Sequence, residues 1–250
     1  MNNIVLIGGG GHCKSVIDVI EQDGQFNIEG IIDKPELLGT NILGYSVFGI
    51  DNDLPKLANK YKYALITVGQ IKSPNLRVKL FDMAIKSGFT LPKIISPHSY
   101  VSKHASIGDG VVVMHNAVIN ANASIGNNCI INSKALIEHD CVIAEHCHIS
   151  TNATINGGSQ IEPRCFIGSN VTTKELVTIK ENSFLTFIPE DVYSECVNER
   201  AFLYTSPVGF LVLTVEVDQF TKDKTLLLWM PVARQALGCL SPWSRHMCAP

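Results

Sequence analysis

The sequence predicts a small parallel α/β sheet followed by a parallel β-solenoid. Every sixth residue from Ile95 to Ile167 is Ile or Val. The fifth place of each six-residue step is also restricted, to small or short aliphatic residues. The residues before Ile95 alternate between strand-like and helix-like patterns. A period of six fits neither a helix of 3.6 residues per turn nor an alternating strand, and it is typical of solenoids built from short strands and corners.

The N-terminal region contains the patterns of three strands and two helices. Apolar runs predict buried strands at 4–7, 28–32 and 64–68. Periodic patterns predict helices at 12–22 and 75–86, which end at Gly24 and Gly88. Because strands that alternate with helices usually pair in parallel, we expect this region to form a small parallel sheet.

The hexads predict which side chains point into the solenoid. The first places are Ile95, Val101, Ile107, Val113, Ile119, Ile125, Ile131, Ile137, Ile143, Ile149, Ile155, Ile161 and Ile167. The fifth places are Ser99, Ala105, Val111, Ala117, Ala123, Cys129, Ala135, Cys141, Cys147, Ala153, Ser159, Cys165 and Val171. Stacked coils join these residues into one core. The four cysteines among them are therefore interpreted as small core residues rather than metal ligands or disulfides.

We divide the chain into a sheet domain at 1–92, a solenoid domain at 93–185 and an unassigned tail at 186–250. The hexad pattern is broken at Thr173, where an aliphatic residue is expected, and it is lost in the tail. The tail carries no repeat and no motif, although two apolar runs, 211–215 and 225–229, have the character of strands.

The composition excludes several classes of protein. Hydrophobic residues make up 46% and charged residues 17% of the 250 residues, as in globular chains. The net charge is −3 and no basic block occurs, so we expect no nucleic-acid partner. The first residues lack the pattern of a signal peptide, and no run reaches the roughly 18 apolar residues of a membrane span. We therefore expect a cytoplasmic protein without a membrane partner.

A run of four glycines follows the first predicted strand and opens the first predicted helix. Gly8 and Gly10 match the start of a dinucleotide-type fingerprint, but Cys13 stands where the third glycine would be. Such a turn lets the backbone approach a ligand, and a helix N-terminus attracts phosphate. Asp33 closes the second strand at about the distance where a carboxylate meets a ribose hydroxyl. The pattern favours a nucleotide or nucleotide-sugar site over a plain tight turn.

The second candidate site is the polar segment 138–140, which lies between two inward places of the hexad and so points outward at a corner. Three hexads form one triangular coil, so residues eighteen apart stack on neighbouring coils about 4.8 Å apart. His139 then stacks between Ala121 and Gly157, which both lack bulk. An imidazole beside the carboxylate of Asp140, with space around it, is suited to act as a general base.

The order and spacing of several segments resemble the hexapeptide-repeat sugar acyltransferases of bacterial surface-glycan pathways. This family includes sialic-acid-cluster O-acetyltransferases and N-acetyltransferases that act on UDP-4-amino-sugars. The matching segments are LIGGGGH at 6–12, GIID at 30–33, LGYSVFG at 43–49, ITVG at 66–69, ISP at 95–97, IEHDC at 137–141 and HIS at 148–150. The resemblance covers about residues 3–183. It implies a Rossmann-like domain followed by a left-handed β-helix, and a homotrimer with acetyl-CoA in the groove between adjacent β-helices.

The resemblance also implies roles for individual residues. His139 is the expected general base and Asp140 its polarising partner. The positions expected to line the nucleotide-sugar pocket are Gly10, Gly11, His12, Asp33, Gly69 and Asn75. His148 and Ser169 match positions that contact acetyl-CoA, and Gly157 borders the same groove because it stacks over His139. No metal is expected. Val112, Met114 and Ala121 are read as outward residues available for contacts between protomers.

The favoured function is acetyl-CoA-dependent N-acetylation of a UDP-4-amino-sugar, but three alternatives stay open. One is O-acetylation of a sialic-acid-type sugar. Another is a zinc-dependent hydratase of the carbonic-anhydrase kind, with His139, His146 and His148 as ligands. The third is a nucleotide-sugar binder without catalytic activity.

Overall fold

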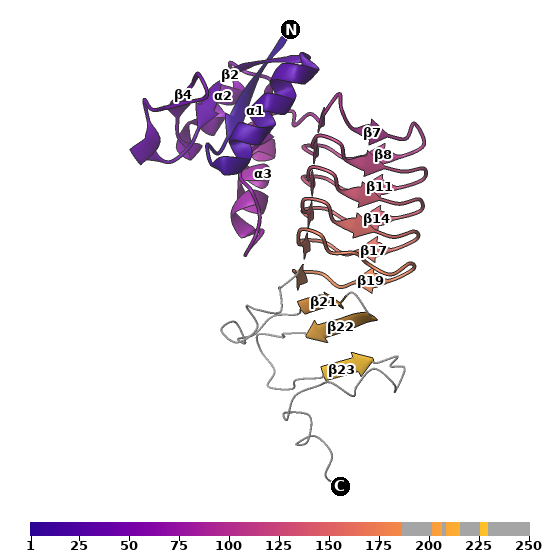
Figure 1. Ribbon diagram of the computed structural model, residues 1–250. Helices are drawn as coiled ribbons and strands as arrows, with labels where there is room; N and C mark the ends of the chain where they lie inside the picture. The colour runs from indigo at the N-terminus through magenta and orange to yellow at the C-terminus, as the bar shows by residue number, and fades with distance from the viewer. Residues whose placement is uncertain (187–201, 207–208, 216–225, 230–250) are drawn as a thin grey trace.

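A computed structural model describes residues 1–186, 202–206, 209–215 and 226–229 (Figure 1). The N-terminal sheet has the strand order β3-β4-β2-β1-β5. Its parallel strands are β1 (Asn2–Ile7), β2 (Phe26–Ile32), β4 (Tyr45–Gly49) and β5 (Tyr63–Ile66), and the short β3 (Asn41–Ile42) pairs antiparallel to β4. The helices are α1 (Gly11–Asp23), α2 (Leu54–Ala58) and α3 (Asn75–Ser87), with 3₁₀ turns η1 (Pro35–Leu37) and η2 (Asp51–Asp53). No helix in these described ranges is long and apolar enough to cross a membrane.

The three predicted strands and two predicted helices of this region are confirmed, with ends that move by one or two residues. The hairpin of β3 and β4 was not predicted. Its turn places Leu43 at a φ of 48° and Gly44 at a φ of 93°. Tight hairpin turns usually carry Asn or Asp where Leu43 stands, so the sequence lacked the usual signal.

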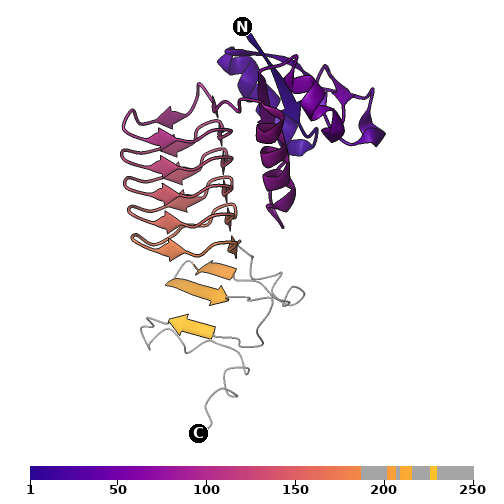
Figure 2. The same cartoon turned by 180° about the vertical axis from the view of Figure 1, so that it is seen from behind.

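The solenoid is a parallel β-helix, as predicted, with strands of two residues in three flat faces (Figures 1 and 2). Face 1 contains β6 (Ile94–Ile95), β9 (Val112–Val113), β12 (Ile130–Ile131), β15 (His148–Ile149), β18 (Phe166–Ile167) and β20 (Phe184–Leu185). Face 2 contains β7 (Tyr100–Val101), β10 (Val118–Ile119), β13 (Leu136–Ile137) and β16 (Thr154–Ile155). Face 3 contains β8 (Ser106–Ile107), β11 (Ser124–Ile125), β14 (Val142–Ile143), β17 (Gln160–Ile161) and β19 (Thr178–Ile179).

The register confirms the eighteen-residue coil. Ile119 pairs with Val101 on one side and with Ile137 on the other. The first and fifth places of the hexads form one continuous core, and the four cysteines among them are fully buried.

The corners of the coils follow a rule that the hexad analysis missed. The fourth place of nearly every hexad has a positive φ; at Asn122, Asp140 and Asn152 the values are 60°, 61° and 57°. This left-handed conformation favours Gly, Asn and Asp, and Asn or Gly fills many of these places. A period-six run of Asn and Gly was therefore the sequence signal for the corners.

The N-terminal domain packs on face 1 of the β-helix. Val112 and Met114 are 0% and 2% exposed and join a core that includes Val16 and Ile17 of α1. The prediction that Val112 and Met114 face a neighbouring protomer is therefore wrong. Their outward direction from the coil is correct, but their own N-terminal domain covers them. In both views of the ribbon, α3 lies on the side of that domain nearest the coils (Figures 1 and 2).

The C-terminal segment contains a described antiparallel sheet of β21 (Phe202–Ser206), β22 (Gly209–Val215) and β23 (Leu226–Trp229). The predicted strands 211–215 and 225–229 correspond to β22 and β23, whereas β21 was not predicted. The remainder of the tail lies outside the described residues.

Candidate active site

His139 and Asp140 lie at the corner between face 2 and face 3, where β13 ends and β14 has yet to begin. Both side chains are exposed, as predicted. The Nδ1 atom of His139 is 2.7 Å from an Asp140 carboxylate oxygen. The second oxygen of Asp140 accepts a hydrogen bond of 2.7 Å from the side-chain amide of Asn122, one coil earlier. Asp140 reaches both partners from a corner position with a left-handed backbone.

This arrangement prepares His139 to accept a proton. A carboxylate only accepts hydrogen bonds, so Nδ1 carries the hydrogen and Nε2 is left with its lone pair. The hydrogen bond to Asp140 raises the pKa of His139 above its usual value. The hydrogen bonds from Asn122 and then from His139 lower the pKa of Asp140, which keeps this carboxylate charged. A base held in one tautomer by a fixed carboxylate is the arrangement that general-base catalysis requires.

Gly157 supports the imidazole from the next coil. A Cβ atom built on Gly157 would lie 3.0 Å from both Cε1 and Nε2 of His139. The space beside Gly157, which was expected to be open for substrate, is therefore partly filled by the His139 ring itself. A side chain at this position would therefore press on the ring in its present place.

We expect Gly157→Ala to displace the imidazole and to lower turnover by about tenfold, because small errors in the position of a base are costly. The melting temperature should hold, since the side chain would point away from the core. The matched control is Ala153→Gly, one hexad earlier, where a buried methyl group is lost. That variant should lose stability rather than the position of the base. Wild-type turnover in Gly157→Ala would show that the ring position is unimportant.

The glycine loop lies at the carboxyl ends of β1 and β5, where the strand order of the sheet reverses direction. Such switch points are the usual ligand sites of open parallel sheets. Gly8 has a φ of 105°, and a Cβ atom there would lie 2.3 Å from Val68 Cγ2. By contrast, a Cβ atom on Gly10 or Gly11 would meet nothing within 4 Å. Gly8 therefore serves packing, while Gly10 and Gly11 border open space where a ligand can approach.

Asp33, Gly69 and His12, which were also predicted to line this pocket, lie around the glycine loop. A carboxylate oxygen of Asp33 accepts a hydrogen bond from the backbone N–H of Gly9, so Asp33 also fixes the loop. Gly69 lies beside His12, because a Cβ atom on Gly69 would be 3.5 Å from the His12 Cβ. Burial of the imidazole, with a contribution from the charge of Arg77, lowers the pKa of His12 to about 3. His12 is therefore neutral, and its Nε2 atom has no partner among the described residues.

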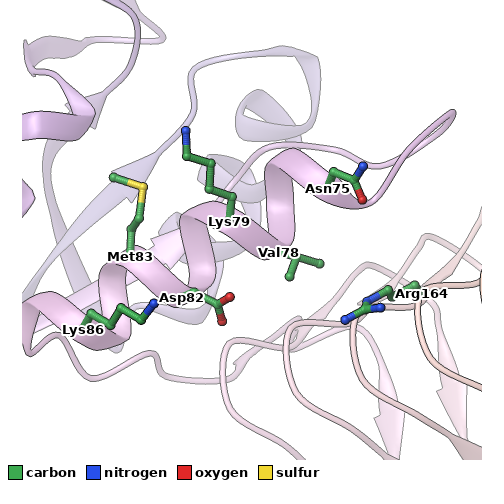
Figure 3. Close-up of a pocket in the computed structure, with 7 residues that line it drawn as sticks. All are labelled: Asn75, Val78, Lys79, Asp82, Met83, Lys86 and Arg164. Atoms are coloured by element: carbon green, nitrogen blue, oxygen red, sulfur yellow. The ribbon is translucent and has the colours of Figure 1, made fainter.

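Asn75 is the exception. It begins α3 and lines a different groove, of about 430 Å³, together with Lys79, Asp82 and Arg164 (Figure 3). The figure shows α3 on one side of this groove and Arg164 on the facing coils.

His148 and Ser169, predicted to contact acetyl-CoA, lie away from His139. His148 is 6% exposed on face 1, where its Nδ1–H donates to the backbone oxygen of Gln70 over 2.5 Å. Burial lowers its pKa to about 4, so this histidine is neutral. Ser169 is exposed at the corner between face 1 and face 2, with its hydroxyl 3.1 Å from that of Ser150.

The structure thus forms two separate clusters within one chain. The corner that carries His139 is opposite face 1, and face 1 carries the N-terminal domain. A single protomer therefore does not bring His139 to its own glycine loop. The three histidines considered as zinc ligands do not converge either: within the described residues, no group of three or more His, Cys, Asp or Glu side chains is arranged to hold a metal ion.

Comparisons with known proteins agree with this geometry. Residues 3–84 match the model of the PglD N-terminal domain, and residues 89–199 match that of the GMPPB C-terminal domain. PerB from Caulobacter crescentus, in complex with CoA and GDP-perosamine, is 28% identical, with a TM-score of 0.70 over 84% of this chain and 97% of that chain. A mutant of perosamine N-acetyltransferase from the same organism, also in complex with CoA and GDP-perosamine, has the same identity and coverage and a TM-score of 0.71.

Two further solved structures are similar. The acetyltransferase domain of PglB from Neisseria gonorrhoeae, in complex with acetyl coenzyme A, is 26% identical with a TM-score of 0.71, over 82% of this chain and 97% of that chain. WeeI from Acinetobacter baumannii shares the fold at 21% identity and a TM-score of 0.68, over 84% of this chain and 100% of that chain. No curated protein sequence matches this chain.

The chain joins a glycine-loop domain to a β-helix of hexapeptide repeats, and the β-helix carries an imidazole–carboxylate pair at an open corner. This combination defines the class as a hexapeptide-repeat acyltransferase. Within that class, the chain is most like the sugar acyltransferases, because its N-terminal domain matches the PglD model and the solved perosamine N-acetyltransferase and PglB acetyltransferase domain are similar over most of its length. The resemblance stated from the sequence is thereby confirmed.

Proposed function

We propose that this protein transfers the acetyl group of acetyl-CoA to the amino group of a nucleotide-linked amino sugar, with His139 as the general base. The observation that carries the proposal is the hydrogen-bonded pair of His139 and Asp140 at an exposed corner, with its ring seated over Gly157. The solved relatives are described as bound to CoA or acetyl coenzyme A, and the two from Caulobacter also to GDP-perosamine, which supports this co-substrate and this class of acceptor.

In the proposed reaction the sugar amine attacks the thioester carbonyl and forms a tetrahedral intermediate. Nε2 of His139 takes the proton that the amine loses, and Asp140 stabilises the imidazolium through Nδ1–H. The carbon–sulfur bond then breaks, and the departing thiolate of CoA takes the proton back from Nε2. The products are an N-acetylated sugar and free CoA. The cysteines of the β-helix described here are buried, so attack by the acceptor on the thioester is direct.

The acceptor would bind at the glycine loop through its nucleotide. Open space at Gly10 and Gly11, the N-terminus of α1 and the nearby Asp33 suit a nucleoside diphosphate. We favour a UDP-4-amino-sugar, and the complex of the Caulobacter relative makes the GDP-linked equivalent the first alternative to test. A role in bacterial surface-glycan synthesis in the cytoplasm is part of the same proposal.

Assembly as a homotrimer would bring the two clusters together. If face 2 of each β-helix surrounds a threefold axis, the corner of His139 in one protomer meets the opposite edge of face 2 in the next. That edge carries Ser169 and adjoins the face on which the next N-terminal domain sits. The base of one protomer would then reach a nucleotide sugar and acetyl-CoA held with the help of its neighbour.

The outward residues of the three faces support this choice of seam. Face 1 is covered by its own N-terminal domain. Face 3 presents mainly polar outward residues, among them Ser106, Ser124 and Gln160. Face 2 presents Tyr100, which is 60% exposed, together with the partly exposed Val118. An exposed apolar face of this kind typically marks a contact between proteins.

We therefore expect Val118→Asp to convert a trimer into monomers in multi-angle light scattering at micromolar concentration, because three carboxylates would be buried near the axis. Ser124→Asp places the same charge at the equivalent site of face 3 and should leave the trimer intact. A wild-type monomer, or a trimer that tolerates Val118→Asp, would contradict this seam.

The proposed activity is tested by a screen for CoA thiol release. The purified chain and acetyl-CoA are incubated with UDP- and GDP-linked 4-amino sugars, sialic-type sugars and their CMP forms. Release with a nucleotide-linked amino sugar is the expected result. Release only with a sialic-type sugar would instead support O-acetylation.

A further inference from the structure

The N-terminal domain and face 1 meet in a buried polar junction. It contains Gln70, Arg77, Asn128 and His148, which are 1%, 1%, 0% and 6% exposed. The buried imidazole of His12 belongs to the same region, since the charge of Arg77 adds to burial in lowering its pKa. A dry apolar contact would have sufficed to join two domains, so the polar content of this junction needs an explanation.

Arg77 is the unusual member. Its Nη1 donates to the backbone oxygens of Ile66 and Val68, each over 2.7 Å. Its Nε donates to the backbone oxygen of Asn128 over 3.3 Å. These acceptors are neutral carbonyls, and none of the ion pairs in the described ranges involves Arg77. The guanidinium is therefore a buried positive charge without a counterion.

Four buried polar atoms of the junction are also left without partners in the described structure. They are Nη2 of Arg77, Nε2 of His12, Oε1 of Gln70 and Oδ1 of Asn128. Buried polar groups are normally hydrogen-bonded, and an uncompensated buried charge is strongly unfavourable. The junction therefore has both an excess positive charge and unused hydrogen-bonding capacity.

Arg77 is connected to the glycine loop through the segment that follows β5. It donates a hydrogen bond to the backbone oxygen of Val68, and the Val68 side chain packs directly against Gly8. Thr67, one position earlier, donates its hydroxyl to the backbone oxygen of Gly8 over 2.5 Å. One hydrogen bond to Val68 and the packing of Val68 on Gly8 therefore separate the charge of Arg77 from the loop. A buried charge is weakly screened, so its potential reaches a ligand bound at the loop.

We infer that Arg77 supplies the fixed positive charge that attracts the diphosphate of the nucleotide sugar at the glycine loop, and that the ligand supplies the negative charge that the junction lacks. Arg77 acts through its charge and not by contact, so it is a positioning residue and not a catalytic one. This inference rests on the proposed function, and it adds a source of affinity for the diphosphate that neither the glycine loop nor the N-terminus of α1 provides.

The test separates the charge of Arg77 from its hydrogen bonds. Dissociation constants are measured for a nucleoside diphosphate and for its uncharged nucleoside, UDP with uridine and GDP with guanosine, in wild type, Arg77→Gln and Arg77→Lys. Arg77→Gln should weaken diphosphate binding by about tenfold or more and nucleoside binding much less, as expected for one weakly screened charge. Arg77→Lys keeps the charge and should retain most of the preference for the diphosphate.

Lys86→Gln is the matched control, because it removes a positive charge from the last turn of the same helix, on the outer groove. It should leave the preference unchanged. If Arg77→Gln does not fold, the binding data of Arg77→Lys are used instead. Loss of the preference for the diphosphate in Arg77→Lys, which keeps the charge, would overturn the inference. Equal weakening of both ligands in Arg77→Gln would also overturn it and leave a purely structural role. A wild type that binds no nucleoside diphosphate would refute the proposed function itself, which is a distinguishable outcome.

Discussion

Replacing His139 by alanine should lower the acetylation rate by about 10²-fold or more, the usual contribution of a positioned general base. The imidazole is the only described group at this corner that combines a free nitrogen, a carboxylate partner and an open approach. Its side chain is 62% exposed, so the fold should be unaffected. The rate is measured as CoA release at saturating substrates, and the trimer is checked by light scattering.

His104→Ala provides the control, because His104 is an exposed histidine on the same line of corners, earlier in the stack of coils. That variant should keep full activity. If His139→Ala retained wild-type turnover, the base would have to be another residue.

Asp140→Asn should have a smaller effect on rate and a distinct effect on pH dependence. Asparagine tolerates the left-handed corner, so the backbone is preserved. The carboxylate raises the pKa of His139, and the base is active only when deprotonated. The acidic limb of the rate profile should therefore lie above the usual histidine value in wild type and move to lower pH in the variant. A limb that stays in place would contradict the pairing.

The second large effect is expected at the glycine loop, where substitution of Gly8 should lower stability and substitution of Gly10 should lower ligand affinity. Gly8→Ala should destabilise the N-terminal domain by about 3 kcal/mol, because its φ of 105° disfavours a side chain and the new methyl group would meet Val68. Gly10→Ala should fold normally, since Gly10 has a φ of −73° and faces open space. Its methyl group would instead weaken nucleotide-sugar binding by about tenfold.

Urea unfolding and nucleotide titration of both variants check this pair, and each variant is the control for the other. If Gly10→Ala bound nucleotides as well as wild type does, the ligand would lie elsewhere on the N-terminal domain. If Gly8→Ala were fully stable, the close approach of the loop to Val68 would not be a requirement of the fold.

Much of this architecture was predictable because the β-helix repeats one local rule. The hexad places its large residue inside at every step, so the register, the eighteen-residue coil and the outward direction of His139 follow from counting. Asp140 and Asn122 stack for the same reason. The Asn122 hydrogen bond was visible only in the structure, since stacking does not specify which side-chain atoms meet.

The contacts between the domains were not predictable from the repeat. The hexad shows that Val112, Met114 and His148 point outward, but it cannot distinguish solvent, a neighbouring protomer and the chain's own N-terminal domain. That distinction depends on how a linker near residue 93 orients one domain on the other. Arg77 was missed because it lies on a predicted amphipathic helix, where an arginine normally indicates a solvent-facing position.

The proposed role of His139 as the base in acetyl transfer to a nucleotide-linked amino sugar can be measured directly on the product. The most direct measurement is mass-spectrometric detection of the N-acetylated nucleotide sugar after incubation with acetyl-CoA, for wild type and His139→Ala at equal concentrations of trimer. We expect product with wild type on a UDP- or GDP-linked amino sugar, and about 10²-fold less with the variant. Product formed equally by both proteins, or CoA released by wild type without an N-acetylated sugar, would contradict the proposal.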